Sequence, residues 1–279
     1  MRSSDEYTRP RASWRGSLYA RTMGCLLKAR CAVTLSLALS ACRSSETVGT
    51  ASRGLDETSA NPSDTRSGTA SSQTAAPDRP GFYLGREIAP TMTHEGADWL
   101  VRPEREAEEN ASRMLAELRL TDGMVACDVG AGNGYHSLPM AKSVGPRGKV
   151  VAVDIQPEML TLLQKRARDV RVANVETILA EPSDPKIPAG TCDLILLADV
   201  YHELDDPAGI LVHLRGALRK DGLLVLLEFR AEDASVPIKP EHKMSRAQIL
   251  KELEHNGFQL VRSFDELPWQ HLLFFGRRH

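Results

Sequence analysis

The segment Met124-Val-Ala-Cys-Asp-Val-Gly-Ala-Gly-Asn-Gly-Tyr135 decides the fold of this 279-residue chain. A short apolar run at 124–128 precedes three glycines at alternate positions, and a second apolar run follows at 149–154. Apolar runs of this length favour strands buried on both faces, and the glycines allow the backbone to turn sharply and approach a ligand. The segment therefore predicts the first strand and the ligand-binding loop of a parallel sheet.

The rest of the C-terminal part repeats this alternation of strand and helix. Expected strands cover 124–128, 149–154, 175–180, 193–199, 222–229, 258–264 and 270–275, and expected helices cover 103–118, 135–143, 157–169, 207–219 and 245–256. A short turn containing Pro268 joins the last two strands, so these two pair antiparallel. The predicted fold is a doubly wound α/β sheet of seven strands, mostly parallel, with the last strand antiparallel.

Ligands of open parallel sheets bind beyond the carboxyl ends of the strands, which is where the chain places its acidic and glycine residues. Asp128 ends the first strand, and Asp154 ends the second, twenty residues after Gly134. A carboxylate at the second position can accept hydrogen bonds from both hydroxyls of a ribose. The predicted loop contacts are Gly130, Ala131, Gly132 and Gly134.

Over residues 120–279 these motifs resemble the class I S-adenosylmethionine-dependent methyltransferases. The resemblance implies S-adenosylmethionine as cofactor, with its methionine part near Asp128 and the glycine loop, its ribose on Asp154 and its adenine against Ile155. Glu181, with Asp184 as a competitor, would face the adenine amine. Asp199 begins a segment, 199–204, that would border the transfer site.

Other parts of the chain resemble a bacterial group of uncharacterised predicted methyltransferases, namely 85–105, 241–244 and 267–268. The resemblance implies methyl transfer to an unidentified small-molecule acceptor. The catalytic candidates are His202, as a general base, and Tyr201, and structural roles for both stay open. Segments 85–102 and 231–244 are placed to cover the site and carry Met92, Trp99 and Ile238.

Two alternative functions remain. One is a non-catalytic protein that binds S-adenosylmethionine or S-adenosylhomocysteine. The other is a nicotinamide-dependent oxidoreductase, although Tyr135 stands where the dinucleotide fingerprint has its third glycine.

Several cysteine, histidine and acidic residues are given structural roles. Cys127 and Cys192 are expected to be small core residues without a disulfide, because they are placed at opposite ends of parallel strands. No metal site is expected, because no H-x-x-x-H spacing joins the histidines. Glu203 and the pair 205–206 are expected to be solvated or to cap the next helix.

The N-terminal region predicts export. Residues 1–41 carry seven basic and two acidic residues, and the apolar stretch 32–41 is too short to span a bilayer. Leu39-Ser-Ala-Cys42 resembles the bacterial lipobox, which implies that Cys42 carries lipid, and Met23 would give a more usual start for this signal.

The predicted organisation is a signal peptide at 1–41, a tether at 42–80, an N-terminal lid segment and helix at 81–119, and the cofactor-binding domain at 120–279. The stretch 43–80 has fourteen Ser or Thr residues and no aromatic residue, which favours a flexible tether. The expected location is a bacterial membrane reached through the N-terminal lipid alone, the outer membrane in a Gram-negative cell, with the cytoplasm as alternative. From Cys42 onward the net charge is −7, which argues against a nucleic-acid partner.

Overall fold

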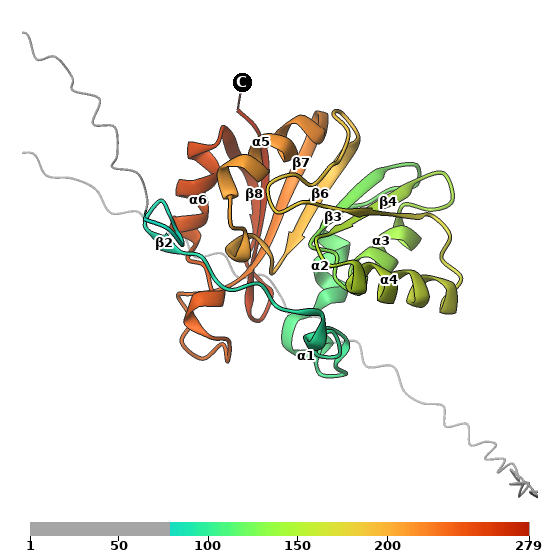
Figure 1. Cartoon of the computed structure of the whole chain (residues 1–279), viewed down its shortest axis with the longest axis horizontal. Coiled ribbons are helices and arrows are strands. Elements are labelled where there is room, and N and C mark those ends of the chain that lie inside the picture. Colours follow the sequence, from blue (N-terminus) through green and yellow to red (C-terminus); the bar gives the residue numbers. More distant parts are fainter. Residues whose placement is uncertain (1–78, 279) are drawn as a thin grey trace, which may run out of the picture. The chain divides into compact units, whose positions relative to one another are not determined.

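The computed structural model describes residues 79–278, in which a seven-stranded sheet carries helices on both faces (Figure 1). The strand order is β5-β4-β3-β6-β7-β9-β8. Neighbours from β5 to β7 pair in parallel, whereas β9 is antiparallel to both β7 and β8, which confirms the predicted fold class. The strands are β3 (Val125–Val129), β4 (Lys149–Asp154), β5 (Val175–Leu179), β6 (Cys192–Ala198), β7 (Leu218–Phe229), β8 (Phe258–Phe264) and β9 (Gln270–Arg277).

Alternate residues of the strands pack on opposite faces of this sheet, because successive side chains of a strand point in opposite directions. Cys127 and Val129 of β3 belong to a core cluster that includes residues of α5 (Pro207–Ala217) and α6 (Arg246–His255). Ala126 belongs to a second cluster with residues of α2 (Ala111–Glu117) and α3 (Ser137–Ser143). Leu163 of α4 (Pro157–Asp169) packs on Ala152 of β4. Two buried faces explain why the strands are almost continuously apolar.

The helix expected at 103–118 is interrupted at Asn110, so that prediction was wrong in one respect. Asn110 has a φ of 53° and separates α1 (Arg105–Glu109) from α2. Asparagine tolerates this left-handed conformation better than most residues, and its side chain accepts a hydrogen bond from the Arg113 amide as an N-cap of α2.

Cys127 and Cys192 form a disulfide, which corrects the expectation of two separate thiols. Their Cα atoms are 5.9 Å apart, a separation that a disulfide spans readily. The expectation failed because it placed both residues at strand ends. Cys127 instead lies in the middle of β3, and Cys192 is the first residue of β6, the strand that pairs with β3.

The segment before α1 folds against the C-terminal half of the domain. It contains a two-stranded hairpin, β1 (Phe82–Tyr83) and β2 (Arg86–Glu87), and two short 3-10 helices, η1 (His94–Gly96) and η2 (Trp99–Val101). Arg86 donates to both carboxylate oxygens of the fully buried Glu252 on α6, at 2.7 and 3.0 Å, and to the carbonyl of His202 at 3.0 Å. The Ala89 amide donates to the same carbonyl. The predicted signal peptide, Cys42 and all of the predicted tether except 79–80 lie outside the described residues.

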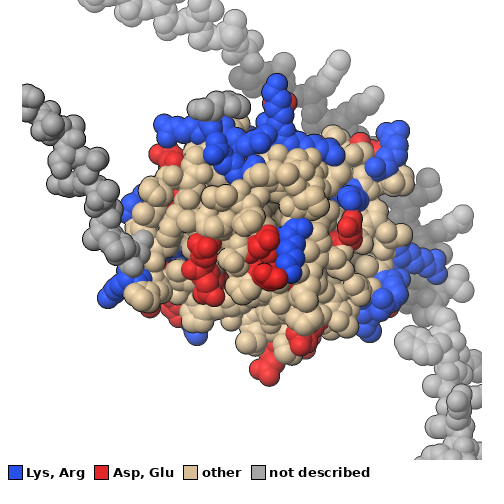
Figure 2. Space-filling model, turned by 45° about the horizontal axis from the view of Figure 1, so that its top comes forward, with Lys and Arg blue, Asp and Glu red and all other residues tan. Residues whose placement is uncertain are grey.

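The surface carries charges of both signs. On the face in Figure 2, Lys and Arg side chains gather along the upper edge, and Asp and Glu side chains lie in separate groups below it. Among residues 79–278, none of the helices has the length and apolar character that crossing a bilayer requires.

Candidate active site

A cavity of about 580 Å³ opens at the carboxyl ends of β3, β4 and β6. The chain order reverses between β3 and β6, and this switch point is where open α/β sheets bind their ligands. The N-terminal segment lines one side through Met92, Trp99 and Leu100, and the segment after β7 lines another through Ile238 and His242. Both segments predicted to cover the site therefore border the cavity. Its volume is in the range of small-molecule sites.

The glycine loop brings two of its predicted contacts, Gly130 and Gly132, to the cavity wall. Both have positive φ, and a Cβ atom on Gly130 would lie 2.4 Å from a methyl carbon of Val200. Only glycine fits that position without displacing Val200. Gly134 serves packing instead, because a Cβ atom there would lie 2.7 Å from Leu163 of α4. Neither Gly134 nor Ala131 is among the residues that line the cavity.

Asp154 lies in the cavity wall with Ile155 beside it. Its two oxygens accept hydrogen bonds from the amides of Gly132, at 2.8 Å, and Gln156, at 2.9 Å. Burial raises the pKa of this carboxyl, and these backbone hydrogen bonds oppose the shift. Ile155 is 44% exposed, which leaves its side chain free to cover a flat ligand.

Glu181 lines the cavity, whereas its competitor Asp184 does not. The Glu181 carboxylate is largely exposed and pairs with Lys186 at 2.7 Å. Asp184 instead accepts from the Lys186 amide at 2.8 Å, within the turn.

Asp128 lies beneath the cavity wall rather than in it. It is 2% exposed and accepts a hydrogen bond from the Ser137 hydroxyl at 2.5 Å. Burial raises the pKa of Asp128 to about 6, an effect that the Ser137 hydrogen bond opposes and the nearby Asp154 charge reinforces.

Asp199 belongs to a buried polar network that the sequence did not reveal. Gln270 of β9 donates to both of its oxygens, at 2.8 and 3.0 Å, and Arg105 of α1 lies 3.6 Å away. Arg105 also pairs with Glu109 at 2.7 Å and lines the cavity. Burial, followed by the Glu109 charge, raises the pKa of Asp199 well above its ordinary value. The i, i+4 spacing of Arg105 and Glu109 was visible in the sequence, but their burial was not.

His202 reaches the cavity, and Tyr201 does not. Both lie in η3 (Tyr201–Glu203) after β6, but the Tyr201 ring is fully buried in the core, where a ligand in the cavity does not meet it. We therefore leave Tyr201 out of the site. The His202 Nδ1 atom is 2.6 Å from the carboxylate of Glu228, a fully buried residue of β7. Burial alone would lower the pKa of His202, but the Glu228 carboxylate raises it above its ordinary value.

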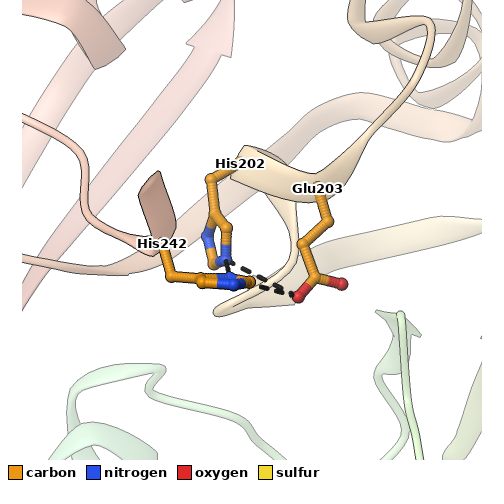
Figure 3. A group of neighbouring side chains, drawn as sticks. All are labelled: His202, Glu203 and His242. Atoms are coloured by element: carbon orange, nitrogen blue, oxygen red, sulfur yellow. Dashed lines mark hydrogen bonds and ion pairs between the residues drawn. The ribbon is translucent and has the colours of Figure 1, made fainter. Parts of the chain in front are cut away.

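Two further side chains converge on the other nitrogen of His202 (Figure 3). The His202 Nε2 atom is 3.1 Å from Nδ1 of His242, which ends η4 (Pro240–His242). Glu203 turns its Oε1 atom toward both rings, at 3.8 Å from His202 and 3.5 Å from His242. Glu203 was expected to be solvated or to cap α5, but it is largely buried, and its pKa is raised by burial to about 7. Asp206 is the residue that caps α5, through the Gly209 amide.

One side chain connects the N-terminal segment that lines the cavity to the end of β4. Gln156, two residues after Asp154, accepts a hydrogen bond from the His94 amide at 2.7 Å and donates to the Met92 carbonyl at 2.9 Å. It lines the cavity and was not expected in the site.

A family described as "Methyltransferase domain" matches residues 120–268, which is more than half of the chain. The chain belongs to this methyltransferase domain family. Its match begins just before β3 and ends just before β9, so it includes every strand end around the cavity.

Individual methyltransferases are similar to parts of this chain. Nocamycin O-methyltransferase of Saccharothrix syringae is 30% identical over 42% of the chain and 41% of its own length. A protein-L-isoaspartate O-methyltransferase of Methanococcoides burtonii is 28% identical over 45% of the chain and 59% of its own length. The chain thus spans less than two thirds of either relative. The crystal structure of a SAM-dependent methyltransferase from Aquifex aeolicus superimposes with a TM-score of 0.63 at 26% identity, over 66% of this chain and 98% of that one.

Proposed function

We propose that this domain transfers the methyl group of S-adenosylmethionine to a small-molecule acceptor bound in the same cavity. The observation that carries the proposal is the cavity wall itself. It combines the glycine positions 130 and 132, the carboxylate of Asp154 and the exposed side chain of Ile155 at one switch point of the sheet. Family membership and the Aquifex aeolicus structure support the same cofactor.

The residues present fit this cofactor. Gly130 and Gly132 line the cavity, and neither has a side chain that would separate the loop backbone from a ligand. Asp154 would accept the ribose hydroxyls, because each of its oxygens has a further lone pair beyond the one used by the loop amides. Ile155 would cover the adenine, and Glu181 would accept from its amine. Asp128 would act from beneath the loop, as a negative charge near the ammonium group of the methionine part.

The sulfonium of S-adenosylmethionine is a methyl donor that needs no activation when bound, so the task of the protein is to align the acceptor and keep water out. Met92, Trp99 and Ile238 would provide apolar contacts for the acceptor from the two covering segments. His202 would accept the acceptor's proton, where the acceptor carries one, because it reaches the cavity and Glu228 fixes its ring. Asp199 would lie between the cofactor and the acceptor.

Calorimetry with S-adenosylhomocysteine tests the cofactor assignment. Asp154→Asn weakens a charge-assisted interaction with the ribose, typically about 1.5–3 kcal/mol per hydrogen bond, so affinity should fall at least about tenfold. Asparagine keeps one oxygen for the loop amides, and thermal unfolding should show that the variant is folded. Asp184→Asn is the matched control, because Asp184 does not line the cavity.

Unchanged binding in Asp154→Asn would refute the ribose assignment. If the wild type binds NAD rather than S-adenosylhomocysteine, the proposal is refuted and the oxidoreductase alternative is favoured. Tight binding of S-adenosylhomocysteine with no turnover on a broad panel of hydroxyl, carboxyl and amine acceptors would favour a non-catalytic binding protein.

We also propose that the protein is an exported lipoprotein of the bacterial methyltransferase group that the covering segments resemble. The buried disulfide between Cys127 and Cys192 supports export, because disulfides persist mainly in oxidising compartments. Export requires a supply of S-adenosylmethionine outside the cytoplasm, and a cytoplasmic location remains the alternative outcome of the localisation test.

A further inference from the structure

Three potential metal ligands meet on the cavity wall: Nε2 of His202, Oε1 of Glu203 and Nδ1 of His242 (Figure 3). We propose that they bind a divalent transition metal ion, with Zn²⁺ as the test case. The sequence argued against a metal because no two histidines had helical ligand spacing. The structure forms the group instead from two adjacent residues after β6 and a third residue forty positions later, in the segment after β7.

The separations of the three atoms match those of ligands around one ion. The pairs are 3.1, 3.5 and 3.8 Å apart. Ligands at Zn²⁺ bond lengths of about 2.0–2.1 Å in a tetrahedron are separated by about 3.3 Å. A circle drawn through the three atoms has a radius of about 2.0 Å, so an ion near its centre lies at bonding distance from all three. Binding would require little movement of the side chains.

The surrounding hydrogen bonds orient the ligands as metal sites require. Metal-bound histidines usually donate their other ring N–H to a carboxylate, a backbone carbonyl or water, which fixes the ring. Glu228 occupies that place, at 2.6 Å from Nδ1 of His202, and its other oxygen accepts from the Tyr201 amide. Oε2 of Glu203 accepts from the Met92 amide at 3.2 Å, which leaves Oε1 directed at the histidines.

A hydrogen bond between the two histidine rings is the simpler interpretation of the 3.1 Å distance. That interpretation accounts for two of the three side chains. A metal ion also accounts for the Glu203 carboxylate, which faces both ring nitrogens and is 13% exposed. The two interpretations differ in whether the group binds an ion in solution.

The role of the ion rests on the proposed methyl transfer. Three protein ligands leave at least one coordination position open, and the three residues line the cavity shared with Gly130 and Asp154. An oxygen of the acceptor, from a hydroxyl or a carboxylate, would take that position. With an ion bound, Nε2 of His202 would be a ligand and would no longer accept the acceptor's proton. A hydroxyl bound to the ion would instead release its proton to solvent more readily, and its oxygen lone pair would form the new O–C bond as the S–C bond of the cofactor breaks.

Titration calorimetry with Zn²⁺ tests the site on the full chain, purified without a histidine tag. Cys25, Cys31 and Cys42 are replaced by Ser in every sample, because their thiols would also bind zinc. We expect saturable binding of one ion per chain. His242→Ala and Glu203→Gln should each weaken Zn²⁺ binding at least about tenfold. His213→Ala is the matched control, because His213 pairs with Asp184 outside the cavity and should leave Zn²⁺ affinity unchanged.

Absence of saturable binding, or equal affinity in wild type and His242→Ala, would overturn the metal site and leave the histidine pair as the explanation. Glu203→Gln keeps the side-chain length and an acceptor for the Met92 amide, so it tests the site even if His242→Ala proves unstable. S-adenosylhomocysteine binding is measured in the same samples. A wild type that binds S-adenosylhomocysteine but not Zn²⁺ rejects the metal site alone, and a wild type that binds Zn²⁺ but not S-adenosylhomocysteine rejects the cofactor assignment alone.

Discussion

Asp128 should make the stability of this domain depend on pH in a way that Asp128→Asn abolishes. The structure raises the pKa of this buried carboxyl from 3.8 to about 6. The folded protein therefore holds the proton more tightly than the unfolded chain. Its contribution to stability is complete below about pH 4 and is lost as the pH rises through about 6. A difference of about two pKa units corresponds to about 3 kcal/mol.

The asparagine side chain that Asp128→Asn introduces is neutral at every pH and can still accept the Ser137 hydrogen bond. The difference in unfolding free energy, variant minus wild type, should therefore rise by about 2.4 kcal/mol in favour of the variant between pH 4 and pH 7. Urea denaturation at several pH values measures it, and taking the difference cancels the titration of other buried groups. Asp169→Asn, at an exposed residue of α4, controls for the substitution itself.

A difference that stays flat with pH, or that favours the wild type at neutral pH, would refute the reasoning. Saturating S-adenosylhomocysteine provides a second check. Its ammonium group near Asp128 favours the carboxylate, so the ligand should reduce the pH-dependent difference between the two proteins. No reduction would argue that the methionine part binds elsewhere.

Two further predictions concern the cysteines. Replacing both Cys127 and Cys192 by Ala should lower the free energy of unfolding by about 4 kcal/mol, because the disulfide closes a loop of 65 residues. In urea denaturation, a reductant should destabilise the wild type and leave the variant unaffected. Equal stability of the wild type and the variant would contradict the disulfide. Cys42→Ala should move the protein from the detergent-extracted membrane fraction to the soluble fraction and abolish palmitate labelling, and identical soluble behaviour of both proteins would show that the lipobox match is accidental.

The sequence was sufficient for the sheet and for the glycine loop because both depend on local pattern. Apolar runs between helical stretches predicted all seven strands, and alternate glycines after β3 predicted a loop that Gly130 and Gly132 bring to the cavity. Local pattern could not show where a residue interrupts a helix that the spacing of apolar residues predicts. Asn110 ended one helix and began another through a left-handed residue in the middle of a helical periodicity.

Contacts between distant residues were the other limit. The disulfide depends on the register in which β3 pairs with β6, and the sequence of either strand alone does not determine that register. Arg105 looked like an ordinary residue of a charged helix, although it is buried beside Asp199. The sequence allowed His242 a place on the ligand-facing rim, but it could not show that His242 meets His202 and Glu203, because these residues are about forty positions away.

The Gln156 amide has a consequence for how the cavity empties. It joins the Met92 and His94 backbone to the end of β4, by two hydrogen bonds of which one is exposed. Each such bond contributes about 1 kcal/mol net, because water replaces it when it breaks. The Met92 amide is held in addition by Glu203. We therefore expect this stretch of the N-terminal segment to open when these few hydrogen bonds break, while the ion pair of Arg86 and Glu252 keeps its other end fixed. Product would then leave past Gln156, and the sheet would stay folded throughout the cycle.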